Sequence, residues 1–145
     1  MKLEDQEVLF SIFHDGSICE ITDLADRLVF SVDIMYLAER INPDFRCFHI
    51  HLMKPYVFFF EDYESGKKTY DFKEINKLEL EILKTDIKDG KIEVFCSSDI
   101  DDIFGFLNIN VVELLIFDQL HKSVGLERLR TIAQEYWGNF GERKG

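Results

Sequence analysis

The stretch Leu28-Val29-Phe30-Ser31-Val32-Asp33-Ile34 decides the fold class, because its apolar residues recur at every even position while Ser31 and Asp33 stand between them. A period of two is that of a β-strand with one buried face. Segment 45–53 repeats the pattern, with apolar residues at the even positions from 48 to 52 and Cys47, His49 and His51 opposite them. These two segments predict a half-buried sheet.

Further strands are expected on both sides of this pair. Residues 8–13 are rich in β-formers and are followed by Asp15-Gly16, a dipeptide that favours a hairpin turn because such turns need positive φ. Asp89-Gly90 predicts a second hairpin between strands near 78–83 and 92–96. Apolar runs at 56–60 and 104–117 complete about eight short strands, with a bulge expected at Gly105. Segments 35–41 and 70–77 are left open between strand and helical turn.

The spacing of apolar residues changes near the C-terminus. From Leu126 to Trp137 apolar residues recur at intervals of three and four, which is the pattern of an amphipathic helix. Ser123 is the expected N-cap and Gly138 the expected end, with a frayed tail at 139–145. The sequence thus predicts one α+β domain, 1–145, mainly antiparallel: a twisted sheet or small sandwich with one C-terminal amphipathic helix packed on it.

Composition narrows the possible partners and location. The net charge of −11 argues against binding to nucleic acid or anionic lipid, and it favours a basic protein partner. No apolar run approaches the roughly 20 residues of a membrane span. The acidic start and three scattered cysteines without a C-x-x-C pair favour a cytoplasmic protein.

Two groups of residues are candidate sites. Asp99, Asp101 and Asp102 form an acidic loop, which we expect to act as a binding patch for a basic partner. The segment that begins at Asp86 reads D-I-K-D-G and does not match the calcium-binding pattern. Neither a nucleophile elbow nor a glycine-rich phosphate loop occurs in the sequence, so we expect no catalytic residue and no cofactor.

Histidines supply the second group. His49 and His51 are two apart on a predicted strand, so both imidazoles point the same way, and His14 is a possible third ligand of a metal ion such as zinc. The alternative, which we favour, is that these histidines occupy the wetter face of a sheet and a turn.

The segment Asp15-Gly16-Ser17-Ile18-Cys19-Glu20-Ile21, followed by strand 28–32, resembles the start of small uncharacterised bacterial β-rich proteins. Those proteins open with a D-G-x-I-x-x-I hairpin, and some are immunity-type proteins that neutralise toxins. The resemblance covers residues 8–60 and brings no active site with it.

These observations favour a non-enzymatic protein-binding domain of bacterial type with an acidic surface, and the resemblance implies an immunity-like inhibitor. Two alternatives remain: a metal-dependent hydrolase that uses the histidines, and a structural subunit of a larger assembly. The sequence leaves the partner and the oligomeric state open.

Overall fold

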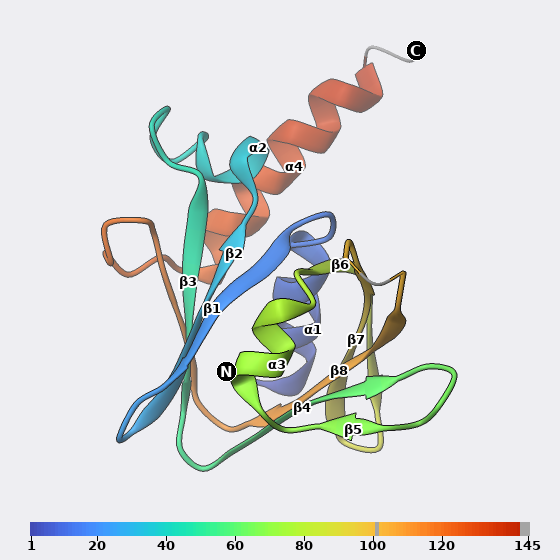
Figure 1. Cartoon of the computed structure of the whole chain (residues 1–145). Coiled ribbons are helices and arrows are strands. Elements are labelled where there is room, and N and C mark those ends of the chain that lie inside the picture. Colours follow the sequence, from blue (N-terminus) through green and yellow to red (C-terminus); the bar gives the residue numbers. More distant parts are fainter. Residues whose placement is uncertain (101, 143–145) are drawn as a thin grey trace.

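The computed structural model describes residues 1–100 and 102–142. Within them the chain forms four helices and nine strands (Figure 1). The helices are α1 (Leu3–Ile12), α2 (Met35–Ala38), α3 (Phe72–Lys77) and α4 (Leu126–Glu142). The strands are β1 (Ser17–Asp23), β2 (Arg27–Asp33), β3 (Cys47–Met53), β4 (Tyr56–Asp62), β5 (Lys68–Thr69), β6 (Leu80–Lys88), β7 (Lys91–Ser98), β8 (Phe104–Val111) and β9 (Leu114–Phe117).

All nine strands belong to one antiparallel sheet in the order β5-β4-β8-β7-β6-β1-β2-β3-β9. The predicted mainly antiparallel α+β class is confirmed, in its single-sheet form. The sheet divides into two arms. We call β1, β2, β3 and β9 the first arm, and β4, β5, β6, β7 and β8 the second arm. Figure 1 shows α1 and α3 between the two arms.

The arms are joined at a corner by two adjacent stretches of chain. Strand β3 passes into β4 through Lys54-Pro55, and β8 passes into β9 through Val112-Glu113. Since β3 pairs with β9 and β4 pairs with β8, the two connections lie side by side. The Met53 amide donates to the Glu113 carbonyl, at 3.0 Å, between the two paired regions. The sheet therefore turns the corner as one continuous ribbon.

At this corner the three residues 53–55 of the β3–β4 connection lie opposite the two residues 112–113 of the β8–β9 connection. Inward-facing positions are odd-numbered in β8, as at Ile109, and even-numbered in β9, as at Ile116. Val112 is left 78% exposed. The N-terminal amino group donates to the Val112 carbonyl, and the side-chain Nε2 of Gln6 donates to the Val111 carbonyl. The first residues of the chain thus supply hydrogen-bond donors to two carbonyl groups of the corner.

The arms meet a second time at a short seam between β1 and β6. Only Ser17 and Glu81 are paired there, with two backbone hydrogen bonds that join Ile82 to Asp15 and Gly16. Further along β1 the place of a partner strand is taken by a side chain. Asn76 of α3 accepts from the Ile21 amide at 2.8 Å and donates to the Ile21 carbonyl at 3.0 Å.

The core lies on the concave side of the sheet and is shared by both arms. Helix α1 contributes Phe10, whose ring packs at 6.5 Å from Phe30, and Phe13, which packs at 5.6 Å from Phe48. Helix α3 contributes Phe72 and the buried Ile75. Burial of this many large side chains is the main stabilising term of the fold. The inward positions of eight strands supply further members of the cluster: Ile18, Leu28, Phe30, Val32, Phe48, Ile50, Leu52, Phe58, Phe60, Leu80, Ile82, Ile92, Val94, Cys96, Leu107, Ile109, Leu114 and Ile116.

The start of the chain differs from the prediction. Residues 8–13 were expected to form a strand, but they belong to α1 and its C-cap Phe13. Leu9, Phe10 and Phe13 are fully buried, and the i, i+1, i+4 spacing places them on one helical face. The Asp15-Gly16 turn therefore joins a helix to β1 and is not a hairpin. The positive φ of 70° at Asp15 is present as expected of this dipeptide.

The remaining expectations for strands and turns have different outcomes. Asp89-Gly90 forms the β6–β7 hairpin with φ values of 53° and 76° at its two residues. Within the segments left open, Met35–Ala38 and Phe72–Lys77 are helical. Gly105 lies within regular pairing, so the bulge expected there is wrong.

The C-terminal helix is present but longer than expected. It begins at Leu126, so Ser123 is not its N-cap; the Ser123 backbone instead pairs with Phe117. It continues through Gly138 to Glu142, so the tail predicted at 139–145 is helical over its first four residues. Its main neighbours are α1 and α2. Tyr136 stacks on Tyr36 of α2 at 4.6 Å.

We expect Gly105→Ala to destabilise the protein by about 1–3 kcal/mol, the usual cost of overpacking a tight site. A Cβ at this position would collide with the Glu61 carbonyl and the Phe60 ring. Urea unfolding measures the change. The control is Gly138→Ala, where a Cβ meets open space on α4 and removes a helical glycine. That control should stabilise by about 0.5–1 kcal/mol, and equal effects of both variants would contradict the packing at Gly105.

Candidate functional site

The predicted acidic loop follows β7. Asp99 occupies a turn directly after the strand, and Asp102 has a φ of 52° before β8 begins; both are exposed. Asp101 lies outside the described residues. Among the residues that the structure describes, no group of histidine, cysteine and carboxylate side chains is arranged to hold a metal ion.

Four aromatic side chains gather beside this loop on the outer face of the second arm. Phe95 alternates with buried Val94 and Cys96, so it points away from the core. Its cross-strand partner Phe106 lies 5.2 Å away, ring to ring. Tyr63 packs against Phe95 and Phe106 at 6.3 and 6.1 Å, and Phe104 stacks on Phe95 at 6.0 Å. We call Tyr63, Phe95, Phe104 and Phe106 the aromatic patch.

The aromatic patch is accessible. Tyr63 is 66% exposed and Phe104 is 46% exposed, while Phe95 and Phe106 are half-buried beneath them. Single exposed apolar residues are common on protein surfaces, but adjacent exposed rings are characteristic of binding surfaces. Tyr63 follows β4 and Phe104 begins β8, at the side of the molecule where the β4–β5 turn projects (Figure 1).

Carboxylates surround the aromatic patch. Asp62, Glu64 and Asp102 line a small hollow of about 90 Å³ together with Tyr63 and Phe104. Glu81 lies across from Ser97, whose other neighbour is Phe104. The surrounding carboxylates Glu64, Glu81, Asp99 and Asp102 form no ion pair with any residue in the described part of the chain.

Nearby negative charges affect the pKa of Glu81. Its pKa is raised first by partial burial, then by the nearby carboxylates of Asp99 and Asp15. Asp62 behaves differently, because its Oδ1 accepts hydrogen bonds from the Ser65 and Glu64 amides. The Ser65 amide is the main reason that the Asp62 pKa is lowered. Asp62 therefore shapes the β4–β5 turn, while Glu81 and Asp99 are left without a compensating cation.

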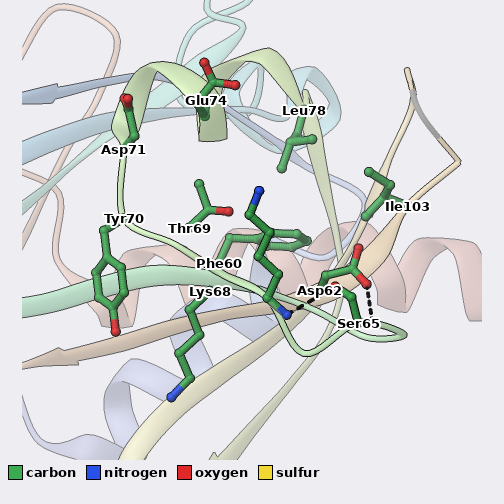
Figure 2. Close-up of a pocket in the computed structure, with 11 residues that line it drawn as sticks. Phe60, Asp62, Ser65, Lys68, Thr69, Tyr70, Asp71, Glu74, Leu78 and Ile103 are labelled. Atoms are coloured by element: carbon green, nitrogen blue, oxygen red, sulfur yellow. Dashed lines mark hydrogen bonds between the residues drawn. The ribbon is translucent and has the colours of Figure 1, made fainter.

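A larger hollow of about 430 Å³ lies on the other side of the β4–β5 hairpin, under α3 (Figure 2). Phe60, Leu78 and Ile103 supply its apolar lining. Its carboxylates serve the local structure: Asp71 accepts from the Lys73 amide as the N-cap of α3, and Glu74 pairs with Lys77 at 3.1 Å. In Figure 2 the oxygens of Asp71 and Glu74 point away from Phe60. We therefore assign structural roles to Asp71 and Glu74, as residues that stabilise α3.

The histidines of β3 lie on the outer face of the first arm. His49 Nδ1 is 3.0 Å from the Ser31 hydroxyl, and its ring stacks on His121 at 4.2 Å. Arg27 donates to His51 Nδ1 at 3.0 Å, so the proton of a neutral His51 is on Nε2. Burial is the main cause that lowers the pKa of both His49 and His51.

His14 is held elsewhere. Its ring stacks on Trp137 of α4 at 5.0 Å, Nδ1 lies 3.0 Å from the Ser11 carbonyl, and Nε2 is 3.7 Å from Asp15. The structure thus brings His49 together with His121 and leaves His14 at the α1–α4 contact. The predicted grouping of His14 with His49 and His51 is not assembled among the described residues.

The sequence analysis missed the aromatic patch and His121. A signal for the patch was present: once Ile92, Val94 and Cys96 face inward, Phe95 must face outward. The same alternation in β8 places Phe104 and Phe106 opposite the buried Leu107. His121 follows β9 in a loop without periodicity and has no comparable signal.

Comparisons with models of protein families, with curated proteins and with solved structures found no match. In the described ranges, 1–100 and 102–142, none of the helices is both long and apolar enough to cross a membrane.

We expect the free energy of unfolding to fall as the pH is lowered through about 6.5. The pKa values of His49 and His51 are lower in the folded protein than the ordinary value of 6.5, so the unfolded chain binds more protons in this range. Their contribution is fully present above pH 6.5 and is lost as the pH falls toward the folded values. Urea unfolding between about pH 8 and pH 6 measures it.

The double variant His49→Gln/His51→Gln is the control for this pH effect. Glutamine retains hydrogen-bonding capacity but does not titrate. The variant should show a flatter pH profile than the unmodified protein. An unchanged slope would contradict the assignment to these two residues.

Proposed function

We propose that this chain is a non-enzymatic protein-binding domain of the immunity-like bacterial kind, which binds a basic protein through the aromatic patch. The observation that carries the proposal is the arrangement of Tyr63, Phe95, Phe104 and Phe106. Their rings pack on one another on the outer face of the sheet. Around them lie Glu64, Glu81, Asp99 and Asp102, which form no ion pair with another described residue.

Each part of this surface has a distinct role in binding. Exposed tyrosine and phenylalanine rings bury large areas at little cost in side-chain entropy, and such residues dominate binding energies at protein interfaces. Carboxylates around them contribute mainly to the rate and orientation of association. Glu81 and Asp99 repel each other in the free protein, and a cationic partner would relieve that repulsion.

The non-enzymatic part of the proposal is supported by the state of the best candidate nucleophile. Ser31 lies within hydrogen-bond distance of His49, which is the pairing of a nucleophile and a base. However, Ser31 is only 4% exposed, and its hydroxyl also lies 3.5 Å from Glu20. Ser31 of β2 thus contacts Glu20 of β1 and His49 of β3, and we infer that it has a structural role between these three strands.

The proposal is tested by affinity capture from bacterial lysate with identification by mass spectrometry. The expected result is a specific basic protein whose binding weakens as salt is raised, since exposed charges are screened. Tyr63→Ser/Phe104→Ser should weaken its binding by about 30-fold, which corresponds to about 2 kcal/mol for removing two interface aromatics. Both side chains are exposed, so the fold should tolerate the change.

Leu120→Ser is the matched control. Leu120 is 63% exposed in the β9–α4 loop, away from the aromatic patch. Binding to the captured protein should survive this change. Capture that is equal for all variants, or a captured partner that is acidic, would overturn the proposal.

A further inference from the structure

Two lysines converge on one aromatic ring at the other end of the second arm's outer face. The Lys68 ammonium lies 5.4 Å from the centroid of the Phe59 ring, and the Lys91 ammonium lies 5.5 Å from the same centroid. Lys68 comes from β5 and Lys91 from the start of β7. The ring attracts both cations but does not neutralise them, because an aromatic quadrupole carries no net charge.

Neither lysine is neutralised by the protein. Lys68 lies opposite Glu61 on β4, yet the two form no ion pair. Lys91 lies opposite another lysine, Lys88, across the β6–β7 hairpin. No carboxylate of the described residues is within ion-pair distance of Lys68 or Lys91. In a chain of net charge −11, two lysines that share one aromatic ring and form no ion pair within the described ranges are a local exception to the acidic surface.

An exposed ring completes the arrangement. Tyr70 packs at 5.0 Å from Phe59 and is 59% exposed. In Figure 2 the Lys68 and Tyr70 side chains point to the same side of β5, away from Thr69. Phe59 itself is only 6% exposed, so it forms the floor of the arrangement while Tyr70 offers a free ring surface.

We propose that Lys68 and Lys91 form a binding site for an anionic group, a carboxylate or phosphate, carried by a small ligand with a flat ring that stacks on Tyr70. Each ammonium group donates a charge-assisted hydrogen bond to the anion. The inference is independent of the proposed protein partner, because the two lysines and Tyr70 are not part of the aromatic patch.

The test uses inorganic phosphate and phenyl phosphate as probes, with binding followed by NMR chemical shifts of the full-length protein. Both probes should give saturable shifts at Lys68, Tyr70 and Lys91, and phenyl phosphate should bind more tightly. Lys68→Gln and Lys91→Gln should each weaken binding by about tenfold, the usual effect of losing one hydrogen bond to a charged group. Glutamine retains part of the aliphatic stem that packs on Phe59.

Two controls separate a site from general attraction to positive charge. Lys73→Gln removes an exposed lysine of α3 from the same region of the chain and should leave both affinities unchanged. Tyr70→Ala should remove the preference for phenyl phosphate while inorganic phosphate still binds. Shifts that do not saturate, or equal losses in Lys73→Gln and Lys91→Gln, would overturn the proposal. Urea midpoints of every variant confirm that the fold is retained.

Discussion

The architecture depends on how the sheet compensates for its short seam between β1 and β6. Where two strands of a curved sheet separate, their backbone N–H and C=O groups need other hydrogen-bond partners, because an unpaired buried backbone group is costly. One pair of residues and two flanking hydrogen bonds carry the contact. The Asn76 carboxamide then imitates a neighbouring strand at Ile21, so α3 both fills the space between the arms and completes the hydrogen bonding of β1.

Much of this arrangement follows from residue patterns and some of it does not. Alternation from Leu28 to Ile34 reports which side chains are buried, and it identifies β2 correctly because burial and strand geometry agree there. Segment 8–13 has the same kind of residues, yet it is helical because α1 is covered by both arms. A short apolar run does not distinguish a strand from a buried helix without its surroundings.

For the candidate binding surfaces, too, residue patterns predict some features while others depend on the tertiary structure. The outward position of Phe95 follows from local alternation, but its meeting with Tyr63 depends on β4 and β7 both pairing with β8. The convergence of Lys68 and Lys91 is likewise set by strand order, which single-sequence patterns do not contain. Sequence patterns assign residues to faces of a sheet, whereas strand order determines which of them become neighbours.

The continuous ribbon at the corner makes the pairing of one arm depend on the other. A slip of β4 against β8 by one residue would exchange core and surface positions, and the same chain segments would carry that slip into β3 and β9. The unequal lengths of the two connections, three residues in β3–β4 against two in β8–β9, let the buried faces of both arms agree in a single alignment. A misaligned pairing therefore loses buried contacts twice, once on each side of the bend.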